Sequence, residues 1–273
     1  MEIAVIGLIF FIIALVVRRK EAFQFRWQPT RDTWAAVGAG MLAFLFSATL
    51  LLVDPASTTA KLVHNGLIYV VCGTVLPWGY VLLVERSTPA ALGWTRERRV
   101  ASLVLSLVMA GLFTPMLFME GDLGAVGWGN VAKASFVLTG AGGLFELFLY
   151  YGFIYLRLEK AFGVIPAILL TSALYVLWHT GTQLPMEPDL IAGIWKLFWV
   201  GVMSLSLFSL TRNLLIIWPF FHATGVMLDF AVNIDGVREV VGDLPWAIAA
   251  VTAMGIVIAG VCWFSKKRER IKV

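Results

Sequence analysis

Long apolar segments follow one another along this chain, and they decide what it can fold into. A helix needs about 20 mostly apolar residues to cross a bilayer, with a tolerated range of roughly 17 to 25. Because lipid offers the backbone no hydrogen-bond partners, such segments have to become helices. The sequence therefore predicts an all-α fold, a polytopic membrane helix bundle of about nine transmembrane helices (eight to nine). The candidate segments are 2–17, 35–53, 67–85, 100–118, 134–156, 164–180, 190–210, 213–230 and 245–264.

Composition excludes a soluble globular domain. Of the 273 residues, 60% are hydrophobic and only 14% are charged, whereas soluble domains carry about 25% charged residues. The segments between the apolar stretches are short, which leaves little room for a receptor head or a nucleotide-binding unit. We expect a single membrane domain.

The placement of basic residues predicts an orientation. Most of the 21 Lys and Arg residues fall in alternate loops or in the tail after Phe264, and cytoplasmic loops are enriched in these residues. We therefore expect an integral protein of the plasma membrane, with the N-terminus outside and the C-terminus cytoplasmic. The basic tail suits the anionic inner leaflet, so we expect the lipid bilayer as a partner and no nucleic acid.

Three ionisable residues lie deep within the apolar segments: Glu146, His179 and His222. Such a residue usually faces the bundle interior and marks a functional site. One of them alone could be a structural hydrogen-bond anchor, but three on different helices are harder to explain in that way. A carboxylate can act as a general base, and neutral imidazoles can bind a metal or stabilise an oxyanion. The set favours hydrolysis over transport.

Further polar residues lie near these three along the chain: Tyr150 and Tyr151 are four and five residues after Glu146, Tyr175 is four before His179, and Asp229 is seven after His222. Residues three, four or seven apart lie on roughly one face of a helix. Each of the three ionisable residues therefore begins or ends a stripe that can line a cavity. The supporting residues expected from these stripes are Tyr150, Tyr151, Tyr175 and Asp229.

Three short motifs in this region resemble those of the CPBP family, which comprises CAAX proteases and bacteriocin-processing membrane enzymes. The family motifs are Glu-Glu-x-x-x-Arg, Phe-x-x-x-His and His-x-x-x-Asn/Asp, on separate helices. Their counterparts in this chain are 146–151, 175–179 and 222–226. The resemblance covers roughly residues 134–230 in the family's order.

The chain departs from these motifs at four positions. The second Glu and the Arg of the first motif are Leu147 and Tyr151. The Phe of the second motif is Tyr175, which is a mild change, and the Asn/Asp of the third motif is Val226. Loss of one oxyanion donor typically lowers an enzyme's rate by about 100- to 1000-fold.

The resemblance implies an intramembrane endopeptidase, a hydrolase acting on a peptide or membrane-anchored protein. Glu146 and His179 would activate water, and His222 would polarise the scissile carbonyl. The family is described both as metalloproteases and as glutamate-type enzymes; in the first case the three residues would hold a divalent metal such as zinc. The implied organisation has N-terminal transmembrane helices over 1–133, a CPBP-like catalytic core over 134–230, and a last helix with a basic cytoplasmic tail over 231–273.

Two other functions stay open at this point. A catalytically degenerate member would keep the fold and act as a membrane scaffold or partner-binding protein, as the losses at Leu147, Tyr151 and Val226 suggest. A transporter is the third alternative. Transporters often contain internal repeats and paired broken helices, neither of which the sequence shows.

Overall fold

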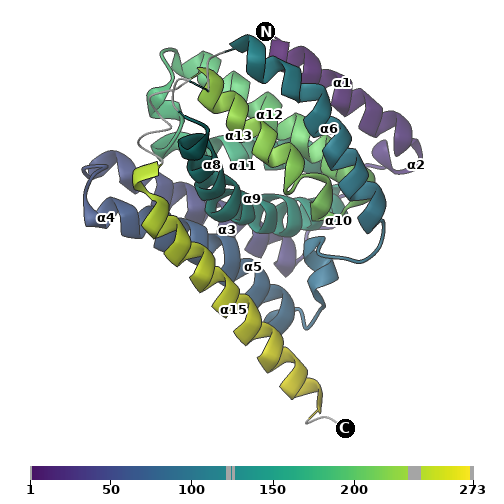
Figure 1. Cartoon of the computed structure of the whole chain (residues 1–273). Helices are drawn as coiled ribbons and strands as arrows, with labels where there is room; N and C mark the ends of the chain where they lie inside the picture. The colour runs from purple at the N-terminus through teal and green to yellow at the C-terminus, as the bar shows by residue number, and fades with distance from the viewer. Residues whose placement is uncertain (1, 121–123, 125–126, 233–240, 271–273) are drawn as a thin grey trace.

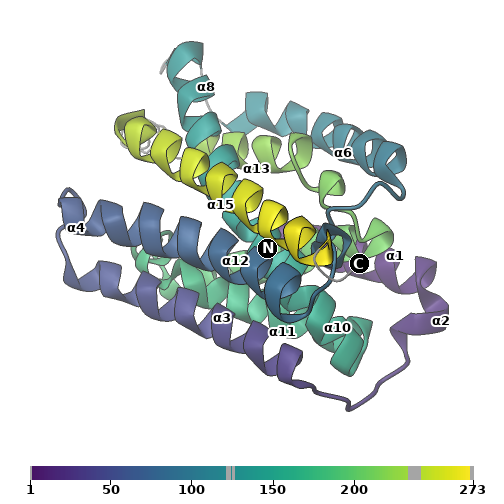
Figure 2. The ribbon, with the colours of Figure 1, turned by 90° about the horizontal axis from the view of Figure 1, so that it is seen from below.

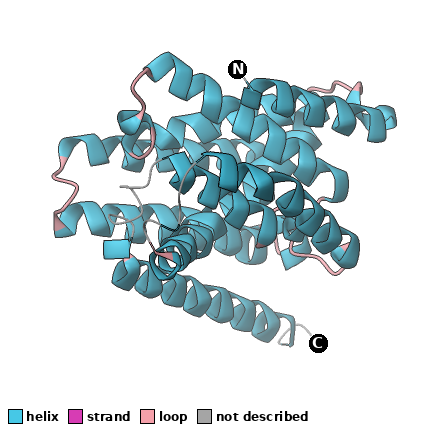
Figure 3. Cartoon of the chain, turned by 45° about the horizontal axis from the view of Figure 1, so that its top comes forward, coloured by secondary structure: helices cyan, strands magenta, loops and turns pink. Residues whose placement is uncertain are grey.

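Helices make up all the regular structure that the computed structural model describes, which covers residues 2–120, 124, 127–232 and 241–270 (Figure 3). The helices in Figure 1 are α1 (Glu2–Val17), α2 (Arg19–Ala22), α3 (Arg31–Thr49), α4 (Thr58–Lys61), α5 (Leu76–Gly79), α6 (Arg99–Glu120), α8 (Trp128–Val137), α9 (Gly143–Glu146), α10 (Leu156–Phe162), α11 (Val164–Trp178), α12 (Leu190–Thr211), α13 (Phe220–Val232) and α15 (Leu244–Arg270).

π-helical and 3₁₀ segments extend or connect these helices. The π-helical segments are η2 (Leu62–Val75), η3 (Tyr80–Val84), η5 (Leu138–Gly142) and η6 (Leu147–Tyr155). The 3₁₀ segments are η1 (Leu50–Leu52), η4 (Pro89–Leu92), η7 (His179–Gly181), η8 (Leu184–Met186) and η9 (Leu214–Ile216).

Seven continuous helices in the described part of the chain are long and apolar enough to cross a membrane. The prediction of an all-α, polytopic helix bundle is therefore confirmed. The seven are Arg31–Leu52, Thr58–Val84, Arg99–Met116, Trp128–Phe162, Val164–Gly181, Leu190–Thr211 and Leu244–Lys267.

Two of the nine expected segments form shorter helices. The first is α1, with 16 residues. In the segment 213–230, only the second half is α-helical, as part of the 13-residue α13. The first half is a turn held by Asn213, whose Nδ2 donates to the carbonyl oxygens of Thr95 and Glu97 at 3.0 and 2.8 Å. Apolar composition could not distinguish this packed turn from a helix.

The helix from Trp128 to Phe162 lies in the middle of the bundle (Figure 1). Within its most apolar window, 78% of the residues are buried, against 17–50% for the other long helices. Every residue of η6 is buried, as expected for a helix that is hydrophobic on all sides. Its neighbours include α3, α11, α12 and η2. This central helix carries Glu146.

A buried arginine joins three segments at one end of the bundle. Nε and Nη2 of Arg157 donate to the two carboxylate oxygens of Glu85 at 3.0 and 2.7 Å. Its Nη1 donates to the carbonyl oxygens of Ala91 and Gly152, both at 3.0 Å. The guanidinium thus uses its planar fork to satisfy a carboxylate and two backbone acceptors at once. Arg157 therefore holds η3 and η4 against the central helix.

A second cluster of charges lies at the same end of the long central helix. Glu159 accepts from both Arg18 and Arg212, and Glu21 accepts from the same two arginines. The hydrogen bond from Arg18 lowers the pKa of Glu21. In both views α2 and α10 lie at one end of the bundle, opposite α4 (Figure 2). These arginines connect the ends of α1, α10 and α12.

Candidate functional site

Glu146, His179 and His222 come together although three separate segments carry them. Glu146 is the last residue of α9, His179 is the first of η7, and His222 is in the first turn of α13. Oε1 of Glu146 lies 3.9 Å from Nε2 of His179. Oε2 of the same carboxylate lies 3.6 Å from Nε2 of His222. One carboxylate therefore has an imidazole facing each of its oxygens.

The three residues are largely withdrawn from solvent. Glu146 is 8% exposed and His179 is 2% exposed, while the side chain of His222 is 14% exposed. Within the described part of the chain, no Lys or Arg forms an ion pair with Glu146. The carboxylate and the two imidazoles therefore form a buried polar cluster that can bind a proton or a small polar ligand.

Tyr175 connects two members of this cluster. Its Oη donates to Oε2 of Glu146 at 3.4 Å. Its carbonyl oxygen, one turn before His179, lies 2.8 Å from Nδ1 of that histidine. Because a carbonyl can only accept, Nδ1 of His179 carries a proton. In the neutral ring, Nε2 is then an acceptor, and it faces Glu146.

A close helix contact holds the segment that begins with His179. The backbone N–H of Gly181 donates to Oγ of Ser47, a fully buried residue of α3, at 2.9 Å. A Cβ at position 181 would lie only 1.8 Å from the carbonyl oxygen of Ser47. A glycine is therefore needed two residues after His179, and it seats η7 against α3.

Gly143 makes room for His222. A Cβ at this position would lie 2.9 Å from Cε1 and 3.1 Å from Nδ1 of the His222 ring. Real Cβ atoms do not approach so closely, so only glycine lets the imidazole lie against α9, one turn before Glu146. Small residues let helices approach closely in membrane bundles, but the sequence does not show which side chain fills the space.

The supporting residues expected from helical spacing have different positions. Tyr150 is fully buried and packs edge-on against Tyr175, with ring centroids 5.6 Å apart. Among the described residues its hydroxyl has no hydrogen-bond partner. Tyr151 instead packs against Phe208 of α12, with centroids 5.8 Å apart. The side chain of Asp229 lies outside the described part of the chain.

Trp178 was not expected at this site. Its ring centroid lies 4.2 Å from that of His179 and 4.9 Å from that of Phe145. Its indole Nε1–H has no hydrogen-bond partner in the part of the chain that the structure describes. The sequence shows that Trp178 directly precedes His179. It does not show whether a Trp in an apolar segment packs beside a functional histidine or only in the core.

The same three residues are the candidate ligands for a divalent metal. Two ligand atoms about 2.1 Å from a tetrahedral zinc ion lie roughly 3.4 Å apart, and the two pairs here are 3.6 and 3.9 Å apart. In the described ranges of the chain, no group of three or more His, Cys, Asp or Glu residues is arranged to hold a metal. We therefore assign no chemistry at this site to a metal.

Comparison with known proteins does not add to this geometry. No protein-family model, no curated protein and no solved structure matches the chain.

Proposed function

We propose that this chain is an intramembrane endopeptidase of the type that the CPBP family represents. The observation that carries the proposal is the convergence of Glu146, His179 and His222, from three separate segments, on one buried position. These are the residues that the resemblance predicts to be catalytic. Their polar groups are 3.6 and 3.9 Å apart, which is too far for direct hydrogen bonds. They are close enough to act on one small molecule.

Water is the molecule that this arrangement suits. Oε1 of ionised Glu146 and Nε2 of neutral His179 are both acceptors, and they lie 3.9 Å apart. A ligand that satisfies both has to donate two hydrogen bonds, and water can do so. In the proposed reaction the water oxygen attacks the scissile carbonyl carbon and loses one proton to Glu146. Glu146 then passes that proton to the leaving amine as the C–N bond breaks.

Negative charge on the carbonyl oxygen needs hydrogen-bond donors. Nε2 of His222 would supply one of them. Val226 cannot supply another, and the hydroxyl of Thr224 already donates to the carbonyl oxygen of Phe220 at 3.0 Å. The buried hydroxyl of Tyr150, one turn after Glu146 and without a described partner, is our candidate for the second donor. A tyrosine can fill this role in an oxyanion hole.

The proposal extends to the substrate and to the orientation of the chain in the membrane. A site enclosed by helices that can cross a membrane suits a peptide or a membrane-anchored protein. We also propose that the bundle lies in the plasma membrane with the N-terminus outside and the C-terminus in the cytoplasm. The bias of Lys and Arg toward alternate loops supports this orientation.

Cleavage of membrane-anchored peptides tests the proposal. The purified chain is incubated in liposomes with a mixture of such peptides, and the products are identified by mass spectrometry. We expect the wild type to cleave at least one peptide, and His179→Ala to lower that rate by at least about 100-fold because one activating base is lost. Cleavage that His179→Ala leaves unchanged would contradict the proposed site.

A matched pair of glycine substitutions tests the position of His222. Gly143→Ala places a Cβ 2.9 Å from Cε1 of the ring, whereas Gly38→Ala meets nothing within 4 Å. We expect Gly143→Ala to push the imidazole away from Glu146 and to slow cleavage about tenfold or more, since loss of a whole oxyanion donor costs about 100-fold or more. Gly38→Ala should cleave at the wild-type rate. Equal rates for both variants would show that cleavage does not depend on where His222 lies.

A second function is favoured by one specific observation. Leu147 and Val226, which replace polar residues of the family motifs, are buried, and Tyr151 packs on Phe208. A degenerate member with these losses would bind a partner peptide or transmembrane helix without cutting it. In that case a partner should co-purify equally with the wild type and with Glu146→Ala, and no cleavage should be detected.

A further inference from the structure

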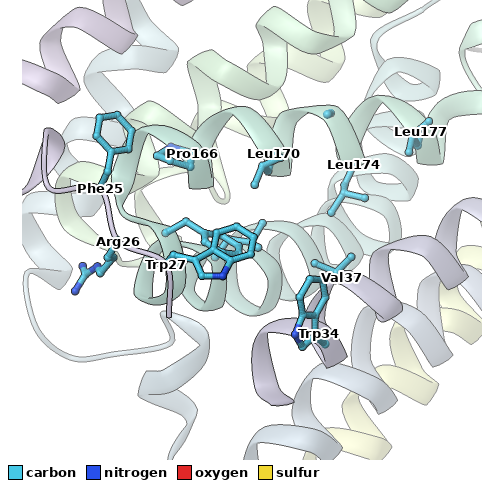
Figure 4. Close-up of a pocket in the computed structure, with 12 residues that line it drawn as sticks. Phe25, Arg26, Trp27, Trp34, Val37, Pro166, Leu170, Leu174 and Leu177 are labelled. Carbon is cyan, nitrogen blue, oxygen red and sulfur yellow. The ribbon is translucent and has the colours of Figure 1, made fainter. Parts of the chain in front are cut away.

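An apolar groove of about 600 Å³ lies between α3 and α11, away from Glu146 (Figure 4). The groove is open on one side, and α10 and the segment before α3 complete its walls. The residues that line it are Phe25, Arg26, Trp27, Trp34, Val37, Leu158, Phe162, Pro166, Leu170, Ala173, Leu174 and Leu177.

The length of the groove matches one leaflet of a bilayer. Its wall on α11 runs from Pro166 to Leu177, which at 1.5 Å per residue is about 17 Å. The hydrocarbon core of a bilayer is about 30 Å thick, so each leaflet contributes roughly half of that. A hydrocarbon chain of a single lipid therefore fits along the groove.

Two tryptophans mark the two sides of the groove. Trp27 lies over the ring of Phe162, with centroids 5.0 Å apart, and Trp34 extends from the first turn of α3. Both are well exposed, at 76% and 58%. Exposed tryptophans typically lie at the level of the lipid headgroups. We therefore place the end of the groove beside Trp27 at the membrane surface.

Arg26 supplies the only charge among the residues that line the groove. Its side chain is exposed and has no hydrogen bond or ion pair with any residue that the structure describes. Its backbone is held against α10, because its N–H donates to the carbonyl oxygen of Phe162 at 3.4 Å and the N–H of Gln28 donates to the carbonyl oxygen of Ala161 at 3.0 Å. The side chain extends outward from the groove (Figure 4), and an unpaired guanidinium there can bind a phosphate group beside the groove.

We propose that this groove binds one anionic phospholipid, with an acyl chain along α11 and the headgroup phosphate on Arg26. The apolar lining suits the acyl chain, and the length of the groove suits a lipid of one leaflet. The unpaired guanidinium of Arg26 favours a negatively charged headgroup. This site does not depend on the proposed protease function, because it lies on a different face of α11 from Tyr175, which contacts Glu146.

Lipid retention during purification tests the site. The chain is reconstituted in vesicles of equal parts phosphatidylglycerol and phosphatidylcholine, extracted into detergent, washed, and weighed intact by native mass spectrometry. We expect one phosphatidylglycerol to remain on each wild-type chain. Arg26→Gln should lower the preference for phosphatidylglycerol about fivefold, the factor typical of one basic residue at an anionic surface. Ala173→Phe, which fills the groove from an exposed position, should abolish retention.

Arg96→Gln is the matched control, because Arg96 is also exposed but does not line the groove. It should retain lipid like the wild type, and the unfolding temperature of each variant shows whether the fold is kept. Equal retention of both lipids, or retention that is the same in Ala173→Phe and the wild type, would show that the bound lipids are nonspecific annular lipids and would overturn the proposal.

Discussion

Glu146→Gln is expected to abolish cleavage of a membrane-anchored peptide, with the rate lowered by at least about 100-fold. The amide keeps the size of the side chain but cannot accept the proton of the attacking water, and general-base catalysis typically contributes 10²–10⁴ in rate. Because the amide oxygen would still accept a hydrogen bond from Tyr175 and the side chain would fill the same buried space, the fold should be unchanged. The measurement is the initial rate of product formation in liposomes, with the unfolding temperature recorded alongside.

Glu97→Gln is the control for this experiment. Glu97 is exposed, and its hydrogen bonds within the described part of the chain involve its backbone, so the same chemical change should leave the rate unaffected. A Glu146→Gln variant that cleaves as fast as Glu97→Gln would remove Glu146 from the mechanism and leave the partner-binding function as the better account.

Arg157→Met is expected to lower the free energy of unfolding by about 3–5 kcal/mol, the range for breaking a buried ion pair by removing one partner. The side chains of Arg157 and Glu85 are only 7% and 14% exposed. The substitution leaves the Glu85 carboxylate and two backbone carbonyl oxygens without their donor. Denaturation of the purified chain in mixed micelles measures the loss.

An exposed ion pair provides the comparison. Lys196 and Glu187 are 3.0 Å apart with side chains that are 40% and 23% exposed, so Glu187→Gln should cost about 0–1 kcal/mol. If Arg157→Met were no more destabilising than Glu187→Gln, the hydrogen bonds of Arg157 would not be holding the ends of these segments together.

The sequence was sufficient to predict the fold class and to single out the three ionisable residues within the apolar segments. Long apolar segments can only be helices in lipid, which is why seven of the expected helices are present at nearly the expected positions. Glu146, His179 and His222 stood out because ionisable residues are costly in such segments. Their meeting is a tertiary contact between three segments, and local spacing alone could not have shown it.

Other features depend on contacts that leave no clear local pattern. The turn over 213–219 is as apolar as a transmembrane helix, but Asn213 and the end of α12 at Arg212, with φ of 53°, stop the helix there. In the sequence, Arg157 and Arg212 counted only as basic residues that help to set the orientation. Their ion pairs could not be predicted, because Glu85 lies 72 residues from Arg157 and Glu159 lies 53 residues from Arg212. The π-helical turns that follow Glu146 also have no sequence signal.

The most direct test of the central claim is cleavage in water enriched in ¹⁸O. The purified chain and a membrane-anchored peptide are incubated in liposomes, and the new carboxyl terminus is analysed by mass spectrometry. If Glu146 and His179 activate water for attack on the peptide carbonyl, one ¹⁸O atom appears in that carboxylate with the wild type, and no such product appears with Glu146→Gln. Labelled product at the same rate from both proteins, or no product from the wild type with any anchored peptide, would contradict the account.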